Sequence, residues 1–553
     1  MNRRILLSQM IGLTTVLLIL VACGTPQPTP TPSQLTTTPT IVPPTATPTP
    51  VITPTSSGPD YWPIEGWRTT TPEEQGMDSD MLAKMLELIQ EQNYDIHSVT
   101  IIRNGYMVAD ATIYPYDPGS KHIIHSCTKS ITSALIGIAI EQGYIESVKQ
   151  PVLSFFPERT VANLDANKEA MTLEHLLMMA SGLECRDSYL YSWRGLFEMM
   201  QTDDWVQFML DLPMAEPPGT RFEYCNGASF LLSAIIQEKT GMSAAAFAEE
   251  HLFDPLGISD VAWPANSQGI TIGWGELRMR PHDMAKIGYL YLNNGQWNGE
   301  QIIPADWVTT STHRQIAATF TPGYGYQWWV AGDNIYMALG LAGQYIIVAP
   351  ELDLVVVFTS NLEDNTIPFG LLYDFIIPTA KAPIPIAPNP DGVKLLESKI
   401  QQVALSQEVP EPVPPLPEIA QRVTGQTYIL DPNPLGFLSV SLTFQEEAEA
   451  LMSVTPSPDE LQQAYGEYRQ YWNDKKEWPI GLDNVYRFTL YYYGIPMALK
   501  GWWINEEKFV IYHDFIGNTG RLRLEFTFDG DKVEMLILDG LEAGTRISGK
   551  LEE

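Results

Sequence analysis

The spacing of hydrophobic and polar positions changes along the chain, and residues 61–381 mix helical with strand periods. Two β-rich runs around Asn104-Gly105 predict a hairpin over residues 98–109. A long apolar run over residues 126–142 stops at Gly143 and predicts a helix. The same patterns predict helices over 172–180, 228–240 and 282–293, and strands over 345–348 and 354–359. Strands at both ends of a helical middle indicate one antiparallel sheet covered by helices, an α/β (α+β) arrangement over residues 61–381.

The last part of the chain has a period of two instead. Residues 438–444 and 522–528 alternate apolar with polar positions, and the second run leads into Asp529-Gly530, a hairpin turn signal. This alternation predicts a small antiparallel β domain, a barrel or a sandwich, over residues 421–553. Residues 382–420 are rich in proline, so we expect a linker between the two domains.

The first residues are typical of a targeting signal rather than of a folded domain. Arg3 and Arg4 precede a largely apolar run, which is typical of an export signal over residues 1–22. The run ends in Leu-Val-Ala-Cys-Gly, which resembles a bacterial lipobox. That resemblance implies that Cys23 carries a diacylglycerol group and becomes the mature N-terminus, and two acyl chains suffice for stable anchoring. An uncleaved membrane helix is the alternative.

A stretch without any charged residue follows over residues 24–57, with threonine and proline alternating along much of it. So much proline and so little apolar surface predict an extended, disordered tether over residues 23–60. We therefore expect an extracytoplasmic lipoprotein, anchored to the membrane of the cell envelope through Cys23. A disulfide bond is allowed in that compartment.

Composition excludes several classes of function. The 66 acidic and 33 basic residues give a net charge of −33, which repels nucleic acid. The four cysteines contain no Cys-x-x-Cys, and the eight histidines contain neither His-Glu-x-x-His nor His-x-His. We therefore expect no nucleic-acid partner, no metal and no cofactor.

Candidate chemistry begins at the long helix, which starts with Ser126-Cys127-Thr128-Lys129. Ser126 and Lys129 are three positions apart and so share one helix face. A serine hydroxyl needs a base to become a nucleophile, and a buried lysine can be held neutral enough to serve. The helix N-terminus also offers free N–H groups for an oxyanion. Ser-x-x-Lys alone is a weak pattern, but its position at the start of an apolar helix strengthens it.

A Tyr-x-Asn motif supplies the second element, and the chain contains three, beginning at Tyr224, Tyr291 and Tyr471. The second lies in an amphipathic run and the third in the β domain. Tyr224 instead follows a Pro-Pro-Gly-Thr-Arg-Phe loop just before a helix. There a tyrosine can relay a proton to a leaving group, while Asn226 can orient Lys129 and a substrate amide.

Together these motifs resemble those of the serine β-lactamase-related superfamily. They are, in order, Ser126-x-x-Lys129, Tyr224-x-Asn226 and Gly340-x-x-Gly343-Gln344. The most similar branch contains class C β-lactamases, DD-peptidases, related esterases and 6-aminohexanoate-dimer hydrolases. The resemblance covers about residues 78–362 and implies a serine β-lactamase-like fold, in which an antiparallel sheet is flanked by an all-helical lobe. Residues 324–329 resemble a sheet strand of that family.

The third motif departs from the pattern at Leu341. Penicillin-recognising members carry lysine or histidine at that position, and a leucine cannot attract a carboxylate. The backbone N–H groups of Gln344 and Ser126 can still form an oxyanion hole, because that role needs no particular side chain. The resemblance therefore implies a serine hydrolase that forms an acyl-enzyme with a small ester or amide, rather than an efficient β-lactamase.

Other functions remain open at this stage. An inactive binding or sensor protein of the same fold is one alternative, and a DD-peptidase acting on peptides or a β-lactamase is another. An α/β-hydrolase is excluded, since the chain contains no Gly-x-Ser-x-Gly. The sequence leaves the oligomeric state open.

The resemblance also suggests a disulfide bond between Cys185 and Cys225, because both segments border the active-site cleft in this family. Lipidation of Cys23 would leave three cysteines, so at most one bridge can form within the chain. Cys127 is expected to be buried and free. The alternative is that all three are buried thiols.

Overall fold

The structure is a computed structural model. It describes residue 59 and residues 61–552, except 188–192, 333, 381, 383, 406–408, 434–436, 446–447, 457–475, 491–495, 518, 520 and 539–543. The expected signal peptide, Cys23 and nearly all of the tether lie outside the described residues. No helix in the described part of the chain is both long enough and apolar enough to span a membrane.

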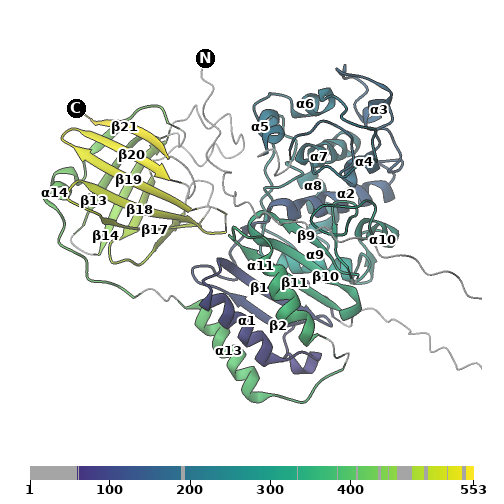
Figure 1. Ribbon diagram of the computed structural model, residues 1–553, viewed down its shortest axis with the longest axis horizontal. Coiled ribbons are helices and arrows are strands. Elements are labelled where there is room, and N and C mark those ends of the chain that lie inside the picture. The colour runs from purple at the N-terminus through teal and green to yellow at the C-terminus, as the bar shows by residue number, and fades with distance from the viewer. Residues whose placement is uncertain are drawn as a thin grey trace, which may run out of the picture.

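One seven-stranded sheet forms the centre of the first domain (Figure 1). Its strands run antiparallel in the order β2-β1-β11-β10-β9-β8-β7. Their bounds are β1 Ile96–Arg103, β2 Tyr106–Thr112, β7 Gly323–Tyr324, β8 Trp329–Val330, β9 Tyr336–Gly340, β10 Gln344–Ala349 and β11 Leu354–Ser360. The expected hairpin is confirmed as β1–β2. Strands from both ends of the domain pair directly in β1–β11, which confirms the single sheet expected from the sequence.

Helices cover both faces of this sheet. Helix α1 (Ser79–Glu91) and helix α13 (Pro390–Ala404) pack together over β1 and β2. Helix α9 (Pro281–Leu292) packs on the other face, where Gly288 lies against Val355 and Ile346. Because side chains alternate across a strand, layers on both faces require strands that are apolar throughout, and every residue of β11 is buried.

Helix α13 corrects one expectation, since residues 390–404 fall inside the segment expected to be a linker. Pro390 occupies the first helical turn after the N-cap Asn389, where proline is tolerated, and the helix contains no further proline. Gly392, Leu396 and Val403 are buried. Proline-rich flanks on both sides concealed an amphipathic helix.

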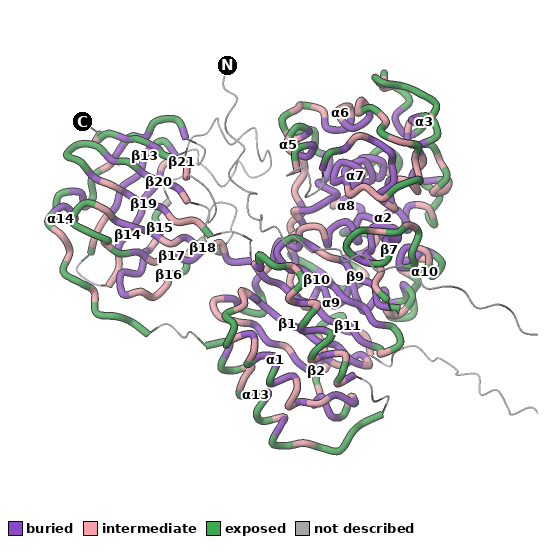
Figure 2. The backbone as a smooth tube through the Cα atoms, viewed as in Figure 1, coloured by how far each residue is buried: buried purple, intermediate pink, exposed green. Residues whose placement is uncertain are grey.

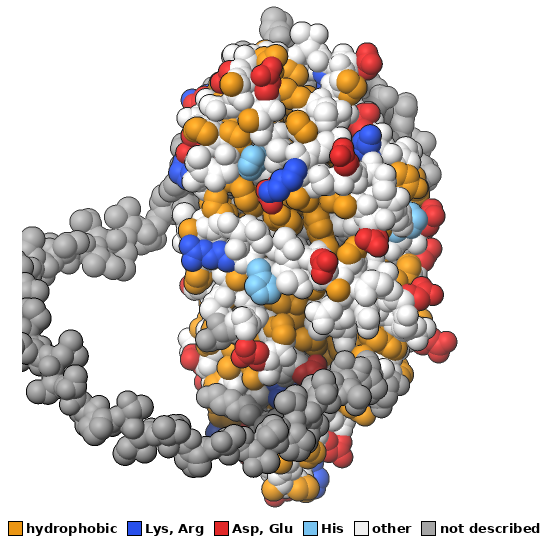
Figure 3. Space-filling view, turned by 90° about the vertical axis from the view of Figure 1, so that its right-hand side faces the viewer, with side chains coloured by type: hydrophobic (Ala, Val, Ile, Leu, Met, Phe, Trp, Pro, Cys, Tyr) orange, Lys and Arg blue, Asp and Glu red, His pale blue; other side chains and the backbone are white. Residues whose placement is uncertain are grey.

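A helical lobe lies beside the sheet, and two nearly buried helices form its centre (Figure 2). They are α2 (Thr128–Glu141), preceded by a 3₁₀ turn η2 (His125–Cys127), and α7 (Asn226–Thr240). The surrounding helices are α3 Ala166–Glu169, α4 Leu173–Leu177, α5 Arg194–Met200, α6 Trp205–Asp211, α8 Ala244–Ala248 and α10 Ala305–Thr312. The face of this domain in Figure 3 carries scattered acidic and basic side chains with hydrophobic ones between them.

The segment expected as one strand over residues 324–329 is instead a tight hairpin. Tyr324 in β7 pairs with Trp329 in β8, and Gln327 between them has a left-handed φ of 63°. The expectation of a single strand is therefore wrong. The sequence gave no sign of the turn, because glutamine is not a residue that favours a left-handed conformation.

The C-terminal domain is a closed β-barrel. Its sheet runs β15-β14-β13-β12-β21-β20-β19-β18-β17-β16, and a further pairing of β15 with β17 closes it. The bounds are β12 Thr427–Leu430, β13 Phe437–Phe444, β14 Glu449–Pro456, β15 Lys476–Gly481, β16 Arg487–Leu490, β17 Pro496–Trp503, β18 Lys508–Phe515, β19 Arg521–Asp529, β20 Lys532–Leu538 and β21 Thr545–Leu551. The predicted β domain is therefore confirmed as a barrel, with the expected hairpin between β19 and β20.

Candidate active site

The start of α2 brings Ser126 and Lys129 together as the spacing predicts. Lys129 Nζ lies 2.9 Å from Ser126 Oγ. Ser126 is half-buried and can be reached from solvent, whereas Lys129 is only 1 % exposed. The 3₁₀ turn before the helix presents the serine, and the first turn of the helix carries the lysine beneath it.

Two further oxygens surround the amine of Lys129. Its Nζ donates to Asn226 Oδ1 at 2.7 Å and to the Trp274 carbonyl at 2.8 Å. Burial lowers the pKa of Lys129 to about 7, although the nearby Asp187 carboxylate opposes the shift. A lysine with such a pKa is substantially neutral at physiological pH and can accept a proton.

Tyr224, in the loop before α7, lies next to Ser126 and Lys129. Its ring centroid lies 4.9 Å from Lys129 Nζ. Burial raises the pKa of Tyr224 well above its ordinary value, although a hydrogen bond with Ser126 works against the shift. Tyr224 therefore stays protonated, so Lys129 rather than Tyr224 is the group able to act as the base.

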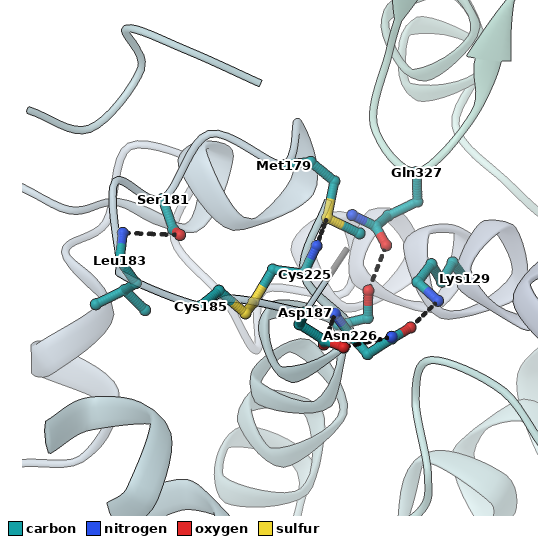
Figure 4. The surroundings of a disulfide bond; sticks show 10 residues. Lys129, Met179, Ser181, Leu183, Cys185, Asp187, Cys225, Asn226 and Gln327 are labelled. Carbon is teal, nitrogen blue, oxygen red and sulfur yellow. Dashed lines mark hydrogen bonds between the residues drawn. A yellow bond between two sulfur atoms is a disulfide. The ribbon is translucent and has the colours of Figure 1, made fainter. Parts of the chain in front are cut away.

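Asp187 is a buried carboxylate that the sequence gave no reason to select. It is 1 % exposed and lies under Asn226 (Figure 4). Asn226 donates its backbone N–H to Asp187 Oδ2 at 2.6 Å and its side-chain Nδ2 to Oδ1 at 3.1 Å. These bonds fix the amide so that its oxygen faces Lys129. Burial raises the pKa of Asp187 to about 7 against these hydrogen bonds.

A disulfide bond joins Cys185 to Cys225, with 6.0 Å between their Cα atoms. Cys225 caps the start of α7 and sits between Tyr224 and Asn226, while Cys185 lies two residues before Asp187. The bridge thus ties the loop of Tyr224 to the segment of Asp187 (Figure 4). Cys127 is a buried free thiol, and burial raises its pKa.

The third motif forms a turn between β9 and β10 at the end of the sheet. A Cβ on Gly340 would lie 2.4 Å from the Ile124 carbonyl, so β9 packs directly against the segment that leads to Ser126. Gly343 has φ 86° and leaves no room for a side chain beside Ser360, whose hydroxyl donates to the Gly343 carbonyl at 2.8 Å. Gln344 is buried, and its side-chain amide donates to the Ser360 carbonyl at 2.5 Å.

Aromatic side chains pack around Tyr224, beside Ser126 and Lys129. Trp329 stacks on Tyr224 with 6.0 Å between centroids, and Phe320 meets Trp329 edge-on at 5.7 Å. Trp193 contacts Tyr224 edge-on at 6.3 Å. Phe320 is 45 % exposed and Leu341 is 38 % exposed. The surroundings of Ser126 therefore offer apolar surface to a substrate.

Two curated proteins are similar in sequence to this chain. A 6-aminohexanoate-dimer hydrolase of Paenarthrobacter ureafaciens is 23 % identical over 319 residues, covering 53 % of this chain and 80 % of that protein. An unguisins hydrolase of Aspergillus violaceofuscus is 26 % identical over 159 residues, 28 % of each chain.

Among solved structures, a penicillin-binding protein homologue from Pyrococcus abyssi has a TM-score of 0.43 and 18 % identity, covering 85 % of this chain and 99 % of that one. A hydrolase with promiscuous acyltransferase activity has a TM-score of 0.48 and 15 % identity, covering 54 % and 99 %. The family model described as Beta-lactamase matches residues 83–377, more than half of the chain. The chain therefore belongs to the β-lactamase family.

Proposed function

We propose that the protein is a serine hydrolase that forms an acyl-enzyme on Ser126 with a small ester or amide. The observation that carries this proposal is the position of Lys129 Nζ among Ser126 Oγ and two carbonyl oxygens, those of Asn226 and Trp274. A neutral amine has two N–H groups and one lone pair. The two carbonyls accept the N–H groups, so the lone pair faces the Ser126 hydroxyl.

A second buried lysine makes the contrast clear. Lys168 is fully buried, and its Nζ donates to the backbone carbonyls of Ala162, Leu210 and Leu212 at 2.9, 2.8 and 2.6 Å. Three carbonyls use all three donors of an ammonium group, as in a lysine that stabilises a fold. Lys129 differs because a hydroxyl that can give up a proton takes the third direction.

The proposed reaction follows from these positions. Lys129 Nζ accepts the proton of Ser126 as Oγ bonds to the substrate carbonyl carbon. The backbone N–H groups of Ser126 and Gln344 stabilise the oxyanion. A proton returns through Lys129 and Tyr224 to the leaving oxygen or nitrogen, and the bond to the carbonyl carbon breaks. Water then attacks the acyl group and gives a proton to Lys129. Lys129 passes that proton to Ser126 Oγ as the bond between Oγ and the acyl carbon breaks, so the acid leaves with the hydroxyl of Ser126 restored and Lys129 neutral again.

The surroundings of the site favour a substrate without a carboxylate near Leu341. Leucine supplies neither charge nor a hydrogen-bond donor, and Phe320, which packs on Trp329 beside Tyr224, adds exposed apolar surface. The name of the P. ureafaciens relative, a 6-aminohexanoate-dimer hydrolase, is in line with a small substrate. An ester or amide hydrolase therefore fits better than an efficient β-lactamase.

The test is a substrate panel run on the protein without its tether. It contains short p-nitrophenyl esters, linear amides, D-Ala-D-Ala peptides and nitrocefin, and we expect ester turnover to be the fastest. Ser126→Ala should abolish it, and Lys129→Ala should lower it by roughly 10²- to 10⁴-fold, as expected for loss of a general base. Full activity of Ser126→Ala would contradict the proposal. Absence of turnover across the panel would favour a binding or sensor protein.

We also propose that the protein is exported and held at the membrane of the cell envelope by lipidated Cys23. The support comes from the sequence alone: a charged start, an apolar run and a lipobox-like end at Cys23. Metabolic labelling with radioactive palmitate in a bacterial host tests it. The wild type should be labelled and Cys23→Ser should not, whereas equal labelling of both would refute the anchor.

A further inference from the structure

The C-terminal barrel approaches the catalytic domain through the turn between β18 and β19 (Figure 1). Ile123 donates its backbone N–H to the Gly517 carbonyl at 2.7 Å. His125 Nε2 and Thr519 Oγ1 are 2.7 Å apart and share a hydrogen bond. Both partners in the catalytic domain lie within the three residues that precede Ser126.

The turn of the barrel packs closely against the catalytic domain at Gly517. Gly517 has φ 73°, and a Cβ at this position would lie 2.1 Å from the Lys121 carbonyl. Only glycine allows the two backbones to approach in this way. Beside it, Arg521 of β19 reaches Asp95 at 3.2 Å and Asp514 at 3.0 Å. Backbone contacts, a side-chain hydrogen bond and ion pairs therefore hold the turn against the catalytic domain.

The segment that the turn touches has an unusual conformation. His125 has a left-handed φ of 46°, which is uncommon for a residue with a Cβ and persists only where the surroundings hold it. Burial lowers the pKa of His125 to about 3, so its imidazole is neutral and pairs with the Thr519 hydroxyl. The residue immediately before the nucleophile therefore depends on contacts made around it.

Among the described residues, three contacts on this segment bear on the role of the barrel. The Leu277 carbonyl accepts the N–H of Ile124 at 2.9 Å, and Gly340 of β9 packs against the Ile124 carbonyl. Both belong to the catalytic domain, which the family model matches over residues 83–377. The third contact is made by the turn carrying Gly517 and Thr519, which belongs to the barrel, outside that range.

We propose that the β18–β19 turn of the barrel is a positioning element of the active site, with Thr519 and Gly517 as positioning residues. By holding His125, the turn sets the 2.9 Å distance between Ser126 Oγ and Lys129 Nζ. The inference rests on the proposed function, because it concerns the reactivity of Ser126. The barrel would thus contribute to catalysis by positioning Ser126, without contacting the substrate.

The test compares Thr519→Val with Thr519→Ser in the otherwise unchanged protein. Valine keeps the shape of threonine but loses the hydroxyl, whereas serine keeps the hydroxyl. The first measurement is the rate at which a fluorophosphonate probe labels Ser126, and the second separates kcat from KM for a short p-nitrophenyl ester. Thr527→Val is the matched control, because Thr527 lies half-buried on strand β19, which follows the turn that carries Thr519.

We expect about tenfold slower labelling and a lower kcat at unchanged KM in Thr519→Val, since a 1 Å misplacement can cost roughly a hundredfold. Thr519→Ser should restore the rate, and Thr527→Val should match the wild type. Gly517→Ala should lose reactivity in the same way, with thermal unfolding to check that it folds. Wild-type rates in both Thr519→Val and Gly517→Ala would overturn this inference alone. A wild type whose Ser126 is not labelled would refute the proposed function and this inference with it.

Discussion

Removing the charge of Asp187 should move the pH dependence of the reaction. Asp187→Asn keeps the size of the side chain but removes the carboxylate that faces Lys129 through Asn226. Lys129 must be neutral to take the proton of Ser126, so kcat/KM rises with pH through the pKa of the amine. A nearby negative charge stabilises the ammonium form and raises that pKa, so its removal should shift the rise toward lower pH.

The size of the shift follows from the geometry. The amide group of Asn226 lies between the two charges, with hydrogen bonds of 2.7 Å to Lys129 and 3.1 Å to Asp187. The ammonium and the carboxylate are therefore about 7 Å apart, and at a dielectric constant of about 20 their attraction is ~2 kcal/mol. That energy corresponds to between one and two pKa units. Because the pKa values of Lys129 and Asp187 both lie at about 7, the two groups titrate as a pair. The attraction spreads the two wild-type steps apart, and the variant has only one of the two groups, so it should show a single step about one unit or more below the upper step of the wild type.

The assay is kcat/KM for a short p-nitrophenyl ester across the pH range, followed at a wavelength where product absorbance does not depend on pH. A lower plateau of kcat/KM at high pH is also expected, because the side-chain nitrogen of asparagine cannot accept the hydrogen bond that one carboxylate oxygen of Asp187 accepts from Asn226. Asp203→Asn, an exposed carboxylate in the same lobe, should leave the profile unchanged. A profile in Asp187→Asn that stays in place or moves to higher pH would show that the Asp187 carboxylate does not raise the pKa of Lys129.

Three further outcomes are expected. Leu341→Lys should raise nitrocefin turnover relative to ester turnover, and an unchanged ratio would contradict the account of the third motif. Replacing Cys185 and Cys225 by serine should lower the free energy of unfolding by about 4 kcal/mol in the chain-entropy model for a separation of 40 residues; denaturant titration measures it, and peptide mapping of the unreduced wild type should recover the linked pair. Phe320→Ala should raise KM for long acyl esters more than for acetate, whereas Phe488→Ala, an equally exposed phenylalanine of the barrel, should not.

The sequence predicts best where local spacing decides the structure. Ser126 and Lys129 are three residues apart on one helix, so a helical period alone brings them together. The hairpin around Asn104-Gly105 and the alternating strands of the barrel follow from local turn chemistry and period in the same way. Tyr224 needed more than its spacing, because it had to be chosen among three Tyr-x-Asn motifs by its loop and by resemblance.

The sequence is silent where contacts are long-range or made by the backbone. Asp187 lies 39 residues before Asn226, and the Trp274 carbonyl belongs to the main chain, so neither leaves a pattern. Closure of the barrel depends on β15 pairing with β17, which no period reveals. Helix α13 was missed for a different reason. The linker was predicted from the proline content of residues 382–420 as a whole, which hid the proline-free stretch after Pro390.

The proposed roles of Ser126 as nucleophile and of Lys129 as its base predict where an acyl group is found during the reaction. They are tested most directly by mixing the protein with a slowly hydrolysed ester, stopping the reaction with acid and locating the trapped acyl group by peptide mass spectrometry. We expect one acyl group on Ser126, none in Ser126→Ala and much slower accumulation in Lys129→Ala. An acyl group on another residue, or equal accumulation in the Lys129→Ala variant, would contradict these roles.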